Sequence, residues 1–271
     1  MTIVTETASL KPSSDSKVQN RGGQKNSYGL LPGREGTCPG ATQGENGCTW
    51  VKGAVKKVCY VDGLMRGYPN ITPVLTHNTE VLKNASRDEM ERILTEEYRR
   101  FRDSELRYAA RTGKEPWLAY RNHWSGDYFS EAYAQASANA MAKFPDLLFW
   151  GYTRSFFAVP ILSRLPHVMT YISLDPVNMR EGLDTYYRWQ VDKKHDNVQV
   201  CYLSPTKNND FEEWWHMARK QTKLKELWPQ TPMKLSPCPV DLKKLPTRHG
   251  CSACQKCLGL RQKLVPIWFC P

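Results

Sequence analysis

The stretch WLAYRNHWSGDYFSEAYAQASANAMAKFPDLLFWGYTRS, residues 117–155, combines two apolar runs with a helical pattern between them. WLAYRNH (117–123) and LLFWGYT (147–153) predict buried strands. SEAYAQASANAMAK (130–143) predicts a helix that begins at a serine N-cap. A strand, a helix and a second strand in succession are typical of a βαβ unit. The stretch therefore predicts two parallel strands joined by a helix.

The alternation continues on both sides of this stretch. Further strands are predicted at 167–174 and 197–203, further helices at about 86–111, 178–191 and 210–224, and a short helical link broken by Pro160 at 156–165. Ser86 and Glu89 form a capping box for the first of these helices, and we expect a strand before it. Such α/β units build either a partial (β/α) barrel or an open doubly wound sheet. We expect the partial barrel, with mainly parallel strands and Cys-rich loop segments at both ends.

Composition divides the chain into four predicted regions. They are a disordered tail at 1–29, a Cys- and Gly-rich cluster loop at 30–70, the α/β partial barrel at 71–227 and a Cys-rich C-terminal module at 228–271. Apolar residues make up 40% of the chain, which suits a globular core. No run of about 18 apolar residues and no signal-like start is present, so we expect no membrane contact and a cytoplasmic location.

The chain is basic, with a net charge of +11. Much of the excess lies in residues 193–263, which hold 14 Lys or Arg against 6 Asp or Glu. A basic surface attracts polyanions, so nucleic acid is a candidate partner of this C-terminal region. A solvated basic face, or charge that offsets a bound anionic centre, explains the same composition.

Polar residues follow the predicted strands where binding sites form in parallel α/β folds. His123, Asp127 and Arg154 are the candidate catalytic residues. Gly126 would let a ligand approach the backbone, Asp127 would hold an amine or a ribose hydroxyl, and Arg154 would hold a carboxylate or phosphate. The alternative is that such residues begin loops and cap helices, which we favour for Ser173, Asp175 and Ser204.

Nine cysteines in a chain without a secretory signal favour metal ligation over disulfides. CSACQKC places Cys251, Cys254 and Cys257 at the C-x-x-C-x-x-C spacing of ferredoxin-type [4Fe–4S] sites. Because position i+6 of a helix has turned away from i, the three sulfurs meet only if the backbone curls. Cys238 or Cys270 would supply the fourth ligand, and His249 would instead complete a Cys₃His zinc site.

A second group, Cys38, Cys48 and Cys59, lies in the Gly-rich segment before the predicted sheet. Three thiolates on a loop can converge on a cluster or on zinc, whereas unrelated free thiols are the alternative. The two groups together would hold two clusters, a cluster and a zinc ion, or one cluster with thiols to spare.

TCPGAT, HWSGDYFSEAY, FWGYTRS and the terminal CSACQKC resemble a family of phage and prophage proteins, the gene product 88 family, over about residues 34–269. That family looks like a distant relative of radical S-adenosylmethionine proteins. The resemblance implies a [4Fe–4S] cluster at Cys38, Cys48 and Cys59, with Ser125-Gly126-Asp127 as the cofactor-binding strand end. Those enzymes use C-x₃-C-x₂-C, whereas nine and ten residues separate the cysteines here. So wide a loop would bury the open iron or supply a fourth ligand, which argues against cleavage of S-adenosylmethionine more than against cluster binding.

Three functions fit these patterns. The first is a cytoplasmic iron–sulfur protein of the infected or lysogenic host, acting as a radical or redox enzyme on a small molecule, with enzyme activity itself left open. The second is a zinc-stabilised, nucleic-acid-binding phage protein that stacks bases on Trp214, Trp215 and Trp228. The third is a non-enzymatic cluster protein that binds a host partner. Walker, H-E-x-x-H, G-x-S-x-G and G-x-G-x-x-G motifs are absent from the sequence.

Overall fold

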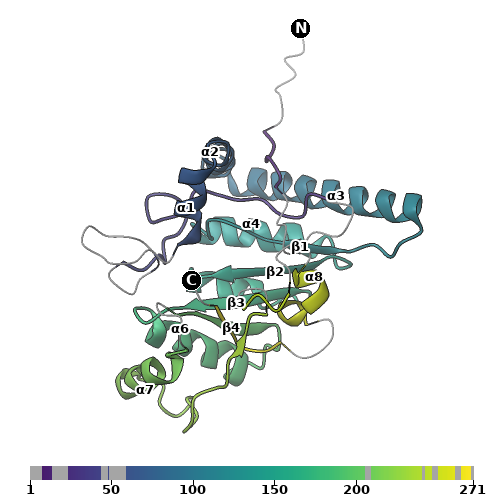
Figure 1. Cartoon of the computed structure of the whole chain (residues 1–271). Coiled ribbons are helices and arrows are strands. Elements are labelled where there is room, and N and C mark those ends of the chain that lie inside the picture. The colour runs from purple at the N-terminus through teal and green to yellow at the C-terminus, as the bar shows by residue number, and fades with distance from the viewer. Residues whose placement is uncertain are drawn as a thin grey trace.

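The computed structural model describes residues 8–13, 24–43, 48, 59–204, 209–239, 242–245, 250–259 and 264–269. In these residues six parallel strands form one curled sheet, a half-barrel, in the order β1-β2-β3-β4-β6-β5 (Figure 1). The strands are β1 (Ala119–Arg121), β2 (Leu148–Thr153), β3 (Val168–Leu174), β4 (Val198–Leu203), β5 (Ser236–Pro237) and β6 (Ile267–Phe269). The prediction of a partial barrel is confirmed.

Helices lie before, between and after the first four strands. They are α1 (Tyr60–Gly67), α2 (Ile71–Lys83), α3 (Arg87–Thr112), α4 (Glu131–Ala142), α5 (Val159–Leu162), α6 (Met179–Tyr186), α7 (Phe211–Gln221) and α8 (Gly250–Cys254). A 3₁₀ turn, η1 (Phe156–Ala158), precedes α5, a π-helical turn, η2 (Tyr187–Asp192), extends α6, and a 3₁₀ turn, η3 (Lys256–Leu258), follows α8. Ser86 and Ser130 cap α3 and α4 by accepting the backbone N–H of Glu89 and Tyr133.

The two faces of the sheet are covered by different parts of the chain. On one face, Phe149 packs against α3 and α4, while Ile172 and Val200 pack against α6 and α7. On the other face, Trp150 and Tyr171 pack beneath the Cys-rich C-terminal segment. Because side chains alternate across a strand, both faces are apolar, which explains the near-continuous apolar runs of the sequence.

The start of the chain differs from the disordered tail that composition predicted. Leu10 and Tyr28 are fully buried, and Ser27 forms a parallel bridge with Arg121 at the end of β1. Residues 24–30 therefore lie along the open edge of β1. Their pairing with this strand provides hydrogen-bond partners for backbone groups that would otherwise be unpaired. Within the predicted tail, Leu10 and residues 26–29 are thus buried, and residues 1–7 and 14–23 lie outside the described ranges.

Two further expectations are corrected. The region before α3 holds the helices α1 and α2 in its described part, in place of the expected strand, and α1 falls inside the predicted loop at 30–70. The C-terminal segment, expected as an irregular module, contributes β5 and β6 to the main sheet. β6 pairs with β4, so Cys201 lies opposite Ile267. Sequence distance conceals this pairing, because β6 follows β4 only after more than sixty intervening residues.

Across the described ranges, no helix combines the length and apolarity needed to cross a bilayer.

Candidate functional site

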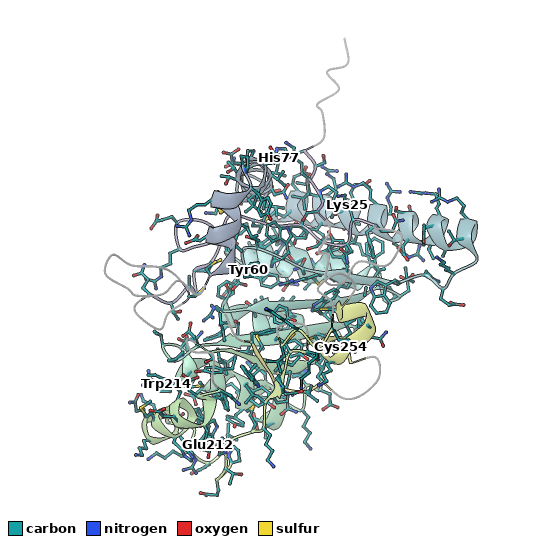
Figure 2. All side chains as sticks on the ribbon, viewed as in Figure 1. Lys25, Tyr60, His77, Glu212, Trp214 and Cys254 are labelled. Carbon is teal, nitrogen blue, oxygen red and sulfur yellow. The ribbon has the colours of Figure 1, made fainter. Side chains whose placement is uncertain are left out.

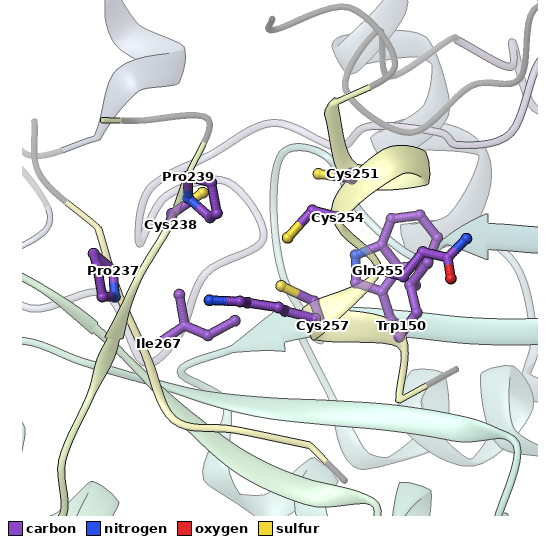
Figure 3. Close-up of a pocket in the computed structure, with 11 residues that line it drawn as sticks. Trp150, Pro237, Cys238, Pro239, Cys251, Cys254, Gln255, Cys257 and Ile267 are labelled. Carbon is purple, nitrogen blue, oxygen red and sulfur yellow. The ribbon is translucent and has the colours of Figure 1, made fainter. Parts of the chain in front are cut away.

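Four cysteines of the C-terminal region line a single pocket, which we call the cysteine pocket: Cys238, Cys251, Cys254 and Cys257. Cys238 follows β5, and the other three lie on α8 and η3. Figure 3 shows the sulfurs of Cys251, Cys254 and Cys257 on one side of the pocket, directed toward the side that carries Cys238. The pocket contains about 400 Å³ of space, part of it open to solvent. The structure thus brings four of the predicted ligands together.

Gln255 produces the backbone curl that the C-x-x-C-x-x-C spacing requires. Its φ of 60° lies in the left-handed region, which ends α8 after Cys254. Its backbone N–H donates to the carbonyl of Cys251 over 2.7 Å, and η3 then carries Cys257. A continued helix would turn the Cys257 sulfur away from Cys251, so this one residue keeps the sulfurs on a common side.

The rest of the cysteine pocket is tied to the sheet. The backbone N–H of Cys238 donates to the carbonyl of Trp268 in β6 over 3.1 Å. The ammonium of Lys256 donates to Ser236 Oγ over 2.8 Å, which joins η3 to β5. Leu258 is buried and packs near Trp150 on β2. Long-range contacts therefore hold both segments that carry the cysteines, namely the one after β5 and the one formed by α8 and η3.

Burial raises the pKa of the Cys257 thiol, and the neighbouring Cys251 and Cys238 raise that pKa further. A hydrogen bond with Tyr152 favours the thiolate and partly offsets this pKa rise. The Cys257 side chain is therefore held as a neutral thiol at neutral pH. A bound metal would displace its proton, so occupancy of this pocket depends on pH.

Among the described residues, no group of three or more His, Cys, Asp or Glu side chains has the geometry to hold a metal ion. The four sulfurs of the cysteine pocket surround a space and do not converge on one point. Two other predicted ligands, Cys270 and the zinc-ligand alternative His249, lie outside the described residues.

The second group, which we call the N-terminal thiols, consists of Cys38, Cys48 and Cys59 and lies at the carboxyl ends of the strands. Thr42 donates to Asp175 Oδ2 over 2.5 Å and accepts the backbone N–H of Cys48 over 2.7 Å. Asp175 follows β3 and forms a buried ion pair with Arg154, which follows β2. Tyr60, labelled in Figure 2, begins α1 and donates to the carbonyl of Trp124. These contacts place the N-terminal thiols over the ends of β1, β2 and β3.

Two of the N-terminal thiols contact each other directly. The side chains of Cys48 and Cys59 share a hydrogen bond, and the backbone N–H of Cys59 donates to the carbonyl of Cys48 over 3.0 Å. This thiol pairing lowers the pKa of Cys59 to about 7, and hydrogen bonds from the first backbone N–H groups of α1 also lower it. The same pairing raises the pKa of Cys48. Burial raises the pKa of Cys38 to about 12.

The predicted cofactor-binding run Ser125-Gly126-Asp127 is packed against the N-terminal segment. Ser125 Oγ donates to the carbonyl of Leu30 over 2.8 Å. At Gly126, whose φ is +82°, a Cβ would lie 2.5 Å from Thr37 Oγ1. Protein atoms therefore occupy the space that a ligand would need beside this glycine.

Asp127 is engaged by the protein on both carboxylate oxygens. They accept the Thr153 hydroxyl over 2.7 Å, the backbone N–H of Arg154 over 2.7 Å and that of Ser155 over 3.2 Å. Burial raises the pKa of Asp127, and these hydrogen bonds oppose that rise. The run Ser125-Gly126-Asp127 does not fit S-adenosylmethionine, because its polar atoms already hold the strand ends together.

His123 faces a buried network of tyrosines, away from Asp127. Its Nε2 lies 2.6 Å from the hydroxyl of Tyr133 and 3.2 Å from that of Tyr28. Asn122 bonds with Tyr28 and Tyr98 in the same network. Burial lowers the pKa of His123 to about 3, so the ring is neutral. His123, Asp127 and Arg154 are each less than 9% exposed, and each one contacts other side chains of the protein.

Arg154 and Cys201 lie between the two cysteine groups. The charge of Arg154 interacts with Asp175, Cys48 and Cys201, and Cys201 in turn interacts with Cys257. Asp175 was expected only to begin a loop, and Cys201 was not among the predicted ligands. An isolated Asp after a strand and an isolated Cys within one carry no signal in the sequence, so pairing of the strands was needed to find them.

Comparison with known proteins supports one family. The sequence model described as gene product 88 matches residues 4–261. The Gene 88 protein of Mycobacterium phage L5 is 34% identical over 212 residues, covering 73% of this chain and 78% of that protein. The Gene 88 protein of Mycobacterium phage D29 is 35% identical over 185 residues, covering 64% of this chain and 70% of that protein. No solved structure matches the chain.

Proposed function

The chain belongs to the gene product 88 family, and we propose that it is an iron–sulfur protein whose cluster is ligated by Cys238, Cys251, Cys254 and Cys257. The observation that carries this proposal is the cysteine pocket, in which four thiols from two segments of the chain line one space. Three of them have the ferredoxin-type spacing, and a left-handed residue turns their sulfurs to a common side.

The C-x-x-C-x-x-C spacing is the feature that supports a cluster over zinc. A single zinc ion needs all four sulfurs at about 2.3 Å from one point. A [4Fe–4S] cluster binds each cysteine to a different iron atom, so its ligands stay further apart and surround a space. The apolar walls from Trp150 and Ile267 would keep water from the cluster, and the Lys256 ammonium would offset its negative charge.

The function that fits this pocket is one-electron redox chemistry, which a [4Fe–4S] cluster supplies when bound. Radical chemistry on S-adenosylmethionine is not part of the proposal, because Ser125, Gly126 and Asp127 are committed to packing. This redox role accommodates either a reaction on a small molecule or electron delivery to a host partner.

Anaerobic purification followed by iron, sulfide and zinc analysis tests the proposal. We expect about four iron and four sulfide per chain and an electron paramagnetic resonance signal after reduction. Cys254→Ser should lose the iron, and the matched variant Cys38→Ser should retain it, because Cys38 lies with the N-terminal thiols. One zinc and no iron in the wild type would refute the cluster, as would full iron content in Cys254→Ser.

The tryptophans that the nucleic-acid hypothesis requires for stacking on bases are packed into the protein. Trp215 and Trp228 are buried, and their indole N–H groups bond to Tyr187 and Asp184. Trp214, labelled in Figure 2, is partly buried against the same core. These tryptophans stabilise the packing of α7, so only the basic charge supports nucleic-acid binding.

A further inference from the structure

The N-terminal thiols divide into a pair and a single cysteine. Cys48 and Cys59 share a side-chain hydrogen bond, and a 3.0 Å backbone hydrogen bond joins the same two residues. Cys38 bonds instead within its own loop, to the backbone of Gly33 and the side chain of Thr37. The arrangement is therefore that of a dithiol with a third thiol nearby, and a three-ligand loop would require this pair to separate.

We propose that Cys48 and Cys59 form a reversible dithiol–disulfide couple. A direct backbone hydrogen bond keeps the two Cα atoms at the short separation that a disulfide requires. Both side chains are half-buried, so a small thiol or disulfide can reach them while bulk solvent stays partly excluded. This couple is independent of the proposed cluster, which uses other cysteines.

The surroundings of Cys59 suit a nucleophile in thiol–disulfide exchange. Cys59 is the N-cap residue of α1, and the backbone N–H groups of Val61 and Asp62 lower the pKa of its thiol. Cys48 lies beside it as the resolving thiol, and Arg154 places a buried positive charge near Cys48. Developing negative charge on Cys59 is thus stabilised by the protein, and Arg154 offsets part of the cost of negative charge on Cys48.

The exchange balances with a low-molecular-mass disulfide as oxidant. Cys59 Sγ attacks one sulfur of that disulfide, so a mixed disulfide forms and the first small thiolate leaves. Cys48 Sγ then attacks Cys59 Sγ, which forms the intramolecular disulfide and releases the second small thiolate. The two protons of the cysteine thiols go to the two leaving thiolates, and two electrons pass from the protein to the oxidant.

Peptide mapping of the full chain after equilibration in glutathione buffers of graded potential tests the couple. Free thiols are trapped by alkylation at each potential, and the whole series is repeated after treatment with dithiothreitol. We expect one disulfide between Cys48 and Cys59 with a single two-electron midpoint, fully reversed by dithiothreitol. Because this measurement uses the wild-type chain, the test does not depend on whether a variant folds.

Three variants sharpen the result. Cys38→Ser should leave the midpoint unchanged, because Cys38 is held within its own loop. Cys48→Ser should trap glutathione on Cys59, and Cys59→Ser should abolish the disulfide. The proposal fails if oxidation links Cys38 to either partner, if no disulfide between Cys48 and Cys59 forms at any potential, or if Cys59→Ser releases bound metal from the reduced chain.

Discussion

The two cysteine groups of this protein are built in opposite ways. In the cysteine pocket, three of the four sulfurs come from one seven-residue motif, and Gln255 orients them within it. In the N-terminal group, nine and ten residues separate the successive thiols, which are positioned through Thr42, Asp175 and Arg154. A short motif therefore carries much of its own geometry, whereas a widely spaced group depends on the fold around it.

The largest predicted effect is the loss of iron when the proposed fourth ligand, Cys238, is replaced. Cys238→Ser should abolish the iron content of the purified chain, because Cys238 lies across the pocket from the C-x-x-C-x-x-C sulfurs. Cys270→Ser is the matched variant and should retain full iron. Iron and sulfide analysis of both proteins decides the matter, and loss of iron only in Cys270→Ser would contradict the assignment.

The dependence of the N-terminal thiols on tertiary contacts predicts a large stability effect at Arg154. Arg154→Met leaves Asp175 buried without its cation, so the free energy of unfolding should fall by about 3 kcal/mol. Urea denaturation measures this change. Arg99→Met, which breaks the exposed ion pair with Glu96, is the control and should have a much smaller effect. Equal losses in the two variants would contradict a special role for the buried pair.

The pH dependence of stability should report His123, which lies at the strand end beneath the N-terminal thiols. Its folded pKa of about 3 lies below its ordinary value of 6.5, so the unfolded chain binds a proton first as pH falls. The stability from the neutral ring is present above pH 6.5 and is lost as pH falls toward 3. Between pH 6.5 and 5 this loss is about 2 kcal/mol.

Denaturant titrations at these two pH values of the wild type and of His123→Gln test that contribution. The variant is less stable at every pH, because the tyrosine network loses a partner. Its free energy of unfolding should nevertheless fall less steeply with acid than that of the wild type. Identical slopes in the two proteins would show that His123 titrates normally.

The smallest predicted effect concerns Gln255, whose backbone conformation orients the cysteines of the C-x-x-C-x-x-C motif. Gln255→Gly removes the strain of a left-handed residue and should raise the free energy of unfolding by about 0.5–1 kcal/mol. Gln255→Val should instead lower it by about 1–2 kcal/mol, because a β-branched residue resists positive φ. The glycine variant should keep its iron and the valine variant should lose it faster in air. The opposite order would contradict the role of this backbone conformation.

Local periodicity accounts for the elements that were predicted well. The helix at 86–111 has a capping box and a regular apolar face, and the strands at 147–153 and 167–174 are short apolar runs between turn residues. These signals depend on neighbours within a few residues of each other. The same locality applies at Cys251, Cys254 and Cys257, whose spacing requires a curled backbone such as Gln255 provides if the sulfurs are to share a centre.

At the strand ends, the surroundings of a residue depend on partners that lie far away in the sequence. Asp127, Ser125 and Gly126 have the composition of a ligand site, yet they contact residues about ninety positions earlier in the chain. Composition cannot separate a polar side chain that binds a ligand from one that binds a packed loop. Burial of Leu10 and Tyr28 was missed for the same reason, because a polar segment was judged without the strand edge that it covers.

The sequence by itself determined the α/β class, the family and the ferredoxin-type cysteine spacing, because each is encoded by residues close together or by extended similarity. Only the tertiary structure decided that Cys238 joins the C-terminal cysteines, that Cys48 pairs with Cys59, and that Arg154 and Cys201 lie between the two groups. Those relations arise when parallel strands bring distant turns to one edge of a sheet, and such long-range pairing leaves no periodic trace in the chain.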